Sequence, residues 1–214
     1  MNLVSDGDSA TYKAITDLNE GAGPYGKEHQ VKKEECVNHV AKRLGTGLRT
    51  LKERTVVQGE GKKRRKQILG GRSKLTEPVI TRMSYYFGVS VRRCANTTPE
   101  QMNNDIMSSL YHCTSTDEEP RHHLCPASED SWYFFERAKA KGQTPPSHST
   151  MKIRFTLEPH EFELVKGVYD RVTTNEMMMR CLRGKTQNAN ESLQRIWAFC
   201  RKNKRDPASH QRTF

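Results

Sequence analysis

Two carboxylates lie in a glycine turn near the amino end of the chain, in the segment Ser5–Ser9. Asp6 and Asp8 directly follow an apolar pair at residues 3–4, which is typical of the end of a strand. A carboxylate at a strand end can hold Mg²⁺ for phosphoryl transfer, provided that other acids converge on it from distant parts of the sequence. The structural alternative is an Asp/Gly turn in which Ser9 caps a following helix.

A third carboxylate, Glu191, stands among amides in the segment 186–193, which reads TQNANESL. Asn and Gln can orient a metal-bound carboxylate without adding charge. The same residues also suit the start of a helix, where Asn caps free N–H groups and Glu compensates the helix dipole. Glu191 is therefore a candidate for the acidic site, with a helix cap as the alternative.

Two pairs of cysteine and histidine have the spacing of half a zinc site each. Cys36 and His39 form the first pair, and His122 and Cys125 form the second. The chain has six cysteines and no recognisable secretory signal, which favours thiols or metal ligands over disulfides. Together the four residues would make a tetrahedral Zn²⁺ clasp between distant segments. The alternative is that they are ordinary buried or surface residues.

The positive charge of the chain is concentrated in one region. Residues 42–93 hold 15 Lys and Arg against 3 Asp and Glu, a net of +12, whereas the whole chain carries +11. Such a regional charge favours a surface that binds a polyanion, so DNA is the expected partner. The run at its centre is a DNA-binding candidate, with a nuclear localisation signal, a phosphate-binding loop or a solvated charge run as alternatives. This run consists of Lys62, Lys63, Arg64, Arg65 and Lys66.

Apolar periodicity predicts a mainly helical chain with two short strands near its start, an α+β fold class. The strands are expected at residues 3–4 and, as a strand or a helix start, at 34–37. Thr98 is the expected N-cap of the helix that starts at residue 99. An exposed basic loop is predicted at 58–73. The aromatic residues 132–135 are expected to plug the core beneath the His/Cys segment, with stacking on nucleic-acid bases as the alternative. Helices are predicted at residues 10–18, 40–51, 76–87, 99–111, 132–141, 159–172 and 175–182, with a last one from about 188.

The motifs in this order resemble Mutator-like transposases, specifically the group found in animal genomes. The matching blocks reach from residue 3 to about 197 and are SDGDS with YK at residues 5–13, ECVNHVAKR at 35–43, STDEEPRHHLCP with EDSW at 115–132, and GKTQNANESL at 184–193.

This resemblance implies a ribonuclease-H-like catalytic domain with a DDE triad that holds Mg²⁺ and performs DNA transposition in the nucleus. Asp6 matches the second acid, with Asp8 as the nearby alternative, and Glu191 matches the third. Cys36 and His39 match the Cys-x-x-His signature that follows the second acid. In the family-like mechanism, two Mg²⁺ ions activate water and then a DNA 3′-hydroxyl for attack on phosphate.

The resemblance also implies a domain plan. Residues 1–44 would be a partial ribonuclease-H-like α/β core, 45–183 a large helical insertion, 184–200 the core helix with the third acid, and 201–214 a disordered tail. The family's first acid lies upstream, so we expect a fragment that lacks the N-terminal part and is inactive alone. Gln194 and the sequence after Trp197 depart from the family pattern.

Two other interpretations stay open: a domesticated, non-catalytic DNA-binding remnant, and a decayed reading frame without a stable fold. No run of apolar residues is long enough to span a membrane, so no membrane partner is expected. A homo-oligomer is left open.

Overall fold

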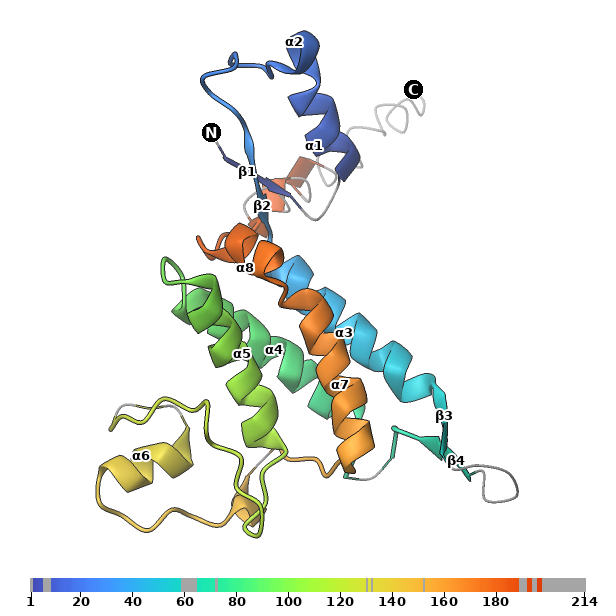
Figure 1. Ribbon diagram of the computed structural model, residues 1–214, viewed down its shortest axis with the longest axis vertical. Coiled ribbons are helices and arrows are strands. Elements are labelled where there is room, and N and C mark those ends of the chain that lie inside the picture. The colour runs from blue at the N-terminus through green and yellow to red at the C-terminus, as the bar shows by residue number, and fades with distance from the viewer. Residues whose placement is uncertain are drawn as a thin grey trace, which may run out of the picture. The chain divides into compact units, whose positions relative to one another are not determined.

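The computed structural model describes residues 2–5, 9–58, 65–71, 73–129, 131, 133–151, 153–188, 192–193 and 196–197. By its internal contacts the chain divides into two compact units. Unit 1 consists of Met1–Cys36 together with Lys185–Phe214, and unit 2 is Val37–Gly184. The described residues are mostly helical with two small two-stranded sheets, which agrees with the predicted α+β class (Figure 1).

Unit 1 contains a β-α-β segment. Strands β1 and β2 pair in parallel, with Asn2 opposite Lys32 and Ser5 opposite Glu35. Parallel strands need a crossover of a dozen or more residues, and the helical segment between them supplies it. The expected strand at residues 3–4 is confirmed, and the second is a strand that ends one residue before Cys36. The elements are β1 (Asn2–Ser5), α1 (Ser9–Thr16), α2 (Leu18–Gly21) and β2 (Lys32–Glu35).

Unit 2 is a group of helices around one apolar core. Helix α3 packs against α4 and α7, α4 also packs against α5, and α5 against α8. Figure 1 shows α3, α4, α5 and α7 lying side by side. None of the described helices is long and apolar enough to cross a membrane. The elements are α3 (Val37–Glu53), α4 (Glu77–Arg93), α5 (Pro99–Cys113), α6 (Phe134–Ala140), the short 3-10 helix η2 (His148–Thr150), α7 (Pro159–Val172) and α8 (Asn175–Cys181).

The spacing of apolar residues explains how α3 packs. Val40, Leu44, Leu48 and Leu51 recur every three or four residues, so they share one face of the helix. All four are buried in the core of unit 2. The opposite positions are polar or charged, which leaves the other side of α3 at the surface.

Helix ends follow local signals in the sequence. At α5 the Thr98 side chain accepts a hydrogen bond from the backbone N–H of Gln101, and the Gln101 side chain accepts one from the backbone of Thr98. This capping box satisfies two N–H groups that the first turn leaves without partners, and it confirms the predicted cap. Helix α7 spans the predicted residues, with Pro159 in its first turn.

The predicted exposed loop at residues 58–73 is wrong in part. Strands β3 (Thr55–Gln58) and β4 (Arg65–Ile68) pair in antiparallel register, with Thr55 opposite Ile68. The basic run biased the prediction toward a loop, whereas backbone pairing with the Val-rich β3 makes residues 65–68 a strand. Residues 59–64 lie outside the described part of the chain.

Candidate functional sites

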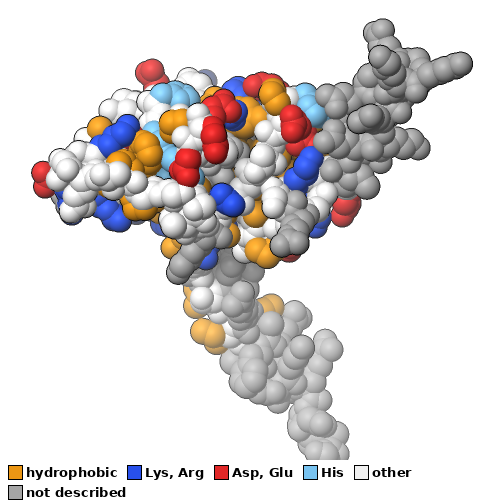
Figure 2. Space-filling model, turned by 90° about the horizontal axis from the view of Figure 1, so that it is seen from below, with side chains coloured by type: hydrophobic (Ala, Val, Ile, Leu, Met, Phe, Trp, Pro, Cys, Tyr) orange, Lys and Arg blue, Asp and Glu red, His pale blue; other side chains and the backbone are white. Residues whose placement is uncertain are grey.

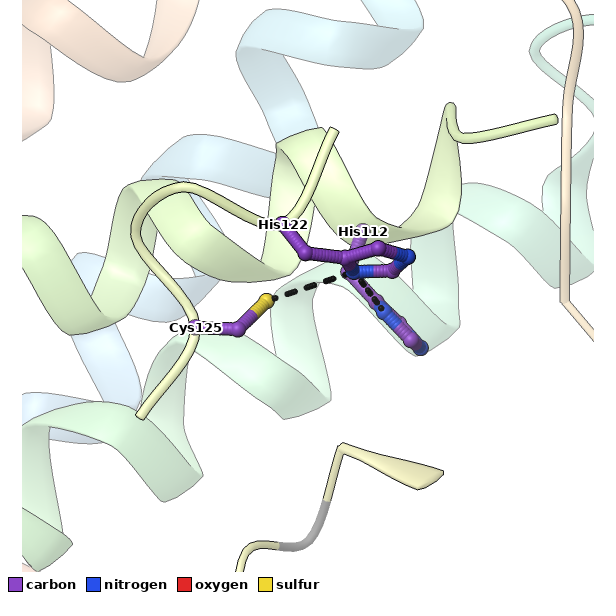
Figure 3. Close-up of side chains that lie close together, drawn as sticks. All are labelled: His112, His122 and Cys125. Atoms are coloured by element: carbon purple, nitrogen blue, oxygen red, sulfur yellow. Dashed lines mark hydrogen bonds between the residues drawn. The ribbon is translucent and has the colours of Figure 1, made fainter. Parts of the chain in front are cut away.

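Three donor side chains converge at one end of unit 2. His112 lies in the last turn of α5, and His122 and Cys125 lie in the loop that follows. The Nδ1 atoms of His112 and His122 are 3.2 Å apart, and the Cys125 sulfur is 3.6 Å from His122 Nδ1. All three ligand atoms lie within 4.8 Å of one another. Figure 3 shows the sulfur and the His112 ring both directed at the His122 ring.

Behind this cluster, His122 is connected to a second histidine and a carboxylate. His122 Nε2 lies 2.8 Å from Nε2 of His148, which belongs to η2. The other ring nitrogen of His148 is 2.7 Å from the Asp117 carboxylate, which also accepts the backbone N–H of His148. The Ser147 hydroxyl donates to the second Asp117 oxygen at 2.5 Å. This chain of contacts fixes the orientation of the His122 ring.

Aromatic rings from the segment around α6 surround the cluster. The Phe135 ring stacks on His122 at 4.1 Å between centroids, and Tyr133 and Phe134 meet His112 edge-on. These contacts confirm the expectation of an aromatic plug for residues 133–135, while Trp132 lies outside the described residues. The rings shield the donor atoms from bulk solvent, and the three cluster side chains are buried.

Burial makes the uncharged forms of the cluster side chains favourable. It lowers the pKa of His112 to about 4 and that of His122 to about 3, with the other histidines adding to the effect. Burial likewise raises the pKa of the Cys125 thiol to about 12. Asp117 behaves in the opposite way: hydrogen bonds from Ser147 and His148 lower its pKa to about 2. The cluster therefore offers two neutral imidazoles and a thiol next to an ionised carboxylate.

The structure brings together only part of the predicted zinc set. His122 and Cys125 lie side by side as their spacing suggested, and His112 joins them. His39 lies in α3 and is not part of this group among the described residues. Cys36 belongs to unit 1. Sequence reasoning missed His112, although its place directly after the predicted helix 99–111, ten residues before His122, was a usable signal.

In unit 1, two segments far apart in the sequence are held together by Gln187. Its side-chain N–H donates to the backbone carbonyl of Val4 at 2.6 Å. Its backbone N–H donates to the sulfur of Cys36 at 3.3 Å. Cys36 in turn donates its backbone N–H to the carbonyl of Ser5. Gln187 thus ties the TQNANESL segment to the carboxyl ends of both parallel strands.

The predicted acids Asp6, Asp8 and Glu191 lie outside the described residues. Lys62, Lys63 and Arg64 do as well. Arg65 and Lys66 are placed by the backbone of β4, which pairs Gln58 with Arg65 and Val57 with Lys66.

A basic groove runs between α3 and α4. The two helices approach closely there, since a methyl group on Gly45 would lie 2.7 Å from the Ser84 hydroxyl oxygen. The groove is lined by three cations, Lys42, Arg49 and Arg92. Glu77 neutralises Arg49 through a two-point hydrogen bond.

Lys42 and Arg92 differ from Arg49, because neither has an acidic partner within 4 Å among the described residues. At the groove edge Tyr85 is 57 % exposed, and the Arg82 guanidinium lies over its ring. In contrast to this cation-lined groove, the face of the molecule in Figure 2 has acidic and basic side chains interspersed.

A comparison with protein families identifies the chain. Residues 1–132, more than half of its length, match the family described as Mutator-like transposase. The chain therefore belongs to the Mutator-like transposase family. Membership of this family implies DNA binding and the use of divalent metal ions. No curated protein and no solved structure matches the chain.

Proposed function

We propose that the chain takes part in DNA transposition by metal-dependent phosphoryl transfer, with Asp6 and Glu191 as two acids of one Mg²⁺ site and Asp8 as the alternative to Asp6. The observation that carries the proposal is the pair of hydrogen bonds from Gln187 to Val4 and Cys36. Asp6 follows Val4 by two residues, and Glu191 follows Gln187 by four. Gln187 therefore joins the segments that carry the two acids.

The topology of unit 1 supports a ribonuclease-H-like core. Its parallel strands end side by side at Ser5 and Glu35, and functional side chains of parallel sheets gather at such carboxyl ends. Unit 1 consists of residues from both ends of the sequence, and the helical unit 2 is formed by the residues that lie between these two segments in the sequence. This arrangement supports a helical insertion before the last acid. Unit 2 begins at Val37, whereas the insertion predicted to start at residue 45 would begin inside α3.

The acids would act by holding metal rather than by attacking DNA themselves. Mg²⁺ prefers oxygen ligands, and in the proposed site it would stabilise the charge that develops on the phosphate. Close carboxylates repel one another unless a cation offsets their charge. The resemblance assigns the first acid to none of these 214 residues, so we propose that this polypeptide does not transfer strands by itself.

Iron-directed cleavage tests whether the two acids share a metal. Fe²⁺ in place of Mg²⁺, with ascorbate and peroxide, should cut the polypeptide near both residue 6 and residue 191. Asp6→Asn or Glu191→Gln should abolish both cuts, whereas Glu176→Gln on the exposed face of α8 should leave them unchanged. Cuts at one position only would refute the shared site. Strand transfer by the purified chain, lost in Glu191→Ala, would refute the proposed inactivity.

A second candidate function is DNA binding without catalysis, as in a domesticated transposase remnant. The observation that favours it is the α3/α4 groove, where Lys42 and Arg92 have no acidic partner within 4 Å among the described residues and Tyr85 is exposed. Lys and Arg side chains that neutralise DNA phosphates release the counterions bound to the DNA, which favours binding. An exposed aromatic ring can stack on a base.

Salt dependence tests the groove. The slope of log affinity against log salt for a DNA duplex should fall by about one for each phosphate contact removed. Lys42→Ala and Arg92→Ala should each flatten the slope, as should neutralising Lys62 to Lys66. Lys139→Ala, which removes an exposed lysine of α6 that is paired with Glu136, is the control and should leave the slope unchanged. An unchanged slope in both groove variants would refute this assignment.

We also propose a nuclear location, because the expected substrate is chromosomal DNA and the run from Lys62 to Lys66 suits a localisation signal. A fluorescent fusion of the whole chain should accumulate in nuclei and lose this accumulation when the run is neutralised. Exclusion of the unaltered fusion from nuclei would contradict the proposal. Self-association stays a prediction that sedimentation can test.

A further inference from the structure

We propose that His112, His122 and Cys125 bind one Zn²⁺ ion through the two Nδ1 atoms and the sulfur, with a water molecule as the fourth ligand. This site lies within unit 2 and uses nitrogen and sulfur donors. It is independent of the proposed acidic site, which would use carboxylate oxygens. Of the four zinc ligands predicted from the sequence, the proposed site keeps His122 and Cys125. His112 takes the place of Cys36 and His39.

The distances between donors fit tetrahedral zinc. With Zn–N bonds of about 2.05 Å and a Zn–S bond of about 2.3 Å, tetrahedral geometry separates two nitrogens by about 3.3 Å and a nitrogen from a sulfur by about 3.6 Å. The observed separations are 3.2 Å and 3.6 Å. Two of the three donor separations thus match the edge lengths of a zinc tetrahedron, and the third pair, His112 and Cys125, lies within 4.8 Å.

The hydrogen-bond chain behind His122 leaves the correct nitrogen available for metal. Asp117 accepts from Nδ1–H of His148, so Nε2 of His148 carries a lone pair. Nε2–H of His122 can donate to that lone pair, which leaves His122 Nδ1 unprotonated. A carboxylate that orients a ligating histidine is a common second layer of zinc sites.

Without a metal ion, hydrogen bonds among these three atoms satisfy them less well than coordination to Zn²⁺ would. His112 Nδ1 and the Cys125 sulfur both lie at hydrogen-bond distance from His122 Nδ1, which offers only a single lone pair. Zn²⁺ instead accepts a lone pair from each of the three atoms. On binding, the S–H bond of Cys125 breaks, its proton leaves to solvent and a Zn–S bond forms, so one proton is released per ion.

Zinc at this position would act as a structural clasp. It would join the last turn of α5 to the loop that carries His122 and Cys125, and through His148 to η2. The donor set also selects the metal, because imidazole and thiolate favour zinc while Mg²⁺ prefers oxygen. The aromatic side chains of residues 133–135 cover the donors.

Metal analysis of the full 214-residue chain tests the site. Protein purified from zinc-supplemented cells should hold about one zinc per chain. After chelation, Co²⁺ should restore the intense visible bands of a tetrahedral site and the near-ultraviolet band of a thiolate–cobalt bond. His112→Ala and Cys125→Ser should lose the metal, whereas Cys36→Ser and His39→Ala should keep it. Folding of each variant is checked by circular dichroism.

Asp117→Asn gives a second measurement that does not remove a ligand. Loss of the oriented His148–His122 chain should weaken zinc affinity by about 10- to 100-fold while one zinc still binds at saturation. Absence of zinc and of cobalt bands in the folded, unaltered chain would overturn the proposal. So would metal that survives in folded His112→Ala and Cys125→Ser but is lost in Cys36→Ser. None of these results depends on cleavage or transfer of DNA.

Discussion

Replacement of Gly47 by alanine should destabilise unit 2 although alanine is the better helix former. A Cβ atom at Gly47 in α3 would lie 2.6 Å from Cγ1 of Val168 in α7. Carbon atoms prefer separations of about 3.5–4.0 Å, so the overlap is about 1 Å. Val168 is buried and β-branched, and its side chain cannot rotate away without leaving its preferred helical rotamer. The two helices must therefore move apart.

Gly167 provides the matched control. It lies in α7, and nothing is within 4 Å of the Cβ that alanine would add. Gly167→Ala should raise the free energy of unfolding by about 1 kcal/mol through helix propensity alone. Gly47→Ala gains the same amount but loses about 1–3 kcal/mol to overpacking. The difference between the two variants isolates the packing cost, because the propensity gain cancels.

Thermal and urea unfolding of the two variants measure this difference. For a chain of this size, about 1 kcal/mol shifts Tm by about 2–4 °C, so Gly47→Ala should melt about 2–12 °C below Gly167→Ala. Gly45→Ala should cost less than Gly47→Ala, since the nearby Ser84 hydroxyl can rotate away from the new methyl group. Equal or greater stability of Gly47→Ala than of Gly167→Ala would refute the close packing of α3 on α7.

Three further predictions concern the cluster, a helix cap and the Gln187 contacts. In the chelated chain, the depressed pKa values of His112 (about 4) and His122 (about 3) supply stability that is complete above about pH 6.5. That stability is lost as the pH falls toward 4, so the urea midpoint should be lower at pH 5 than at pH 7, and equal midpoints would contradict it. Thr98→Ala should cost about 1 kcal/mol of unfolding free energy and Thr98→Ser little; equal losses would argue against side-chain capping. Gln187→Ala should speed amide hydrogen exchange around Val4, and unchanged exchange would show that the side-chain bond does not hold β1.

Much of the helical part of the fold could be predicted from local sequence. The apolar positions of α3 recur every three or four residues, and the predicted range of α7 matches the observed one. The cap of α5 is encoded within four residues by Thr98 and Gln101. Such signals act between near neighbours, so they do not depend on the rest of the chain.

The β3–β4 pair shows where local reasoning fails. A strand requires a partner, and the partner of Arg65–Ile68 is Thr55–Gln58 across an intervening basic segment. The charges of the run dominated the local pattern and suggested a loop. Pairing between separated segments depends on tertiary structure, which hydropathy along a short window does not contain.

The sequence by itself determined the order of the family motifs, the concentration of positive charge and the helices that carry the core. It also indicated His122 and Cys125 as a pair of metal donors. Only the tertiary structure decided that His112 completes their group and that Gln187 meets Val4 and Cys36. The physical reason is that a lone pair or an N–H group finds its partner through space. Spacing in the sequence fixes that geometry within one helix or turn, but not between segments separated by many residues.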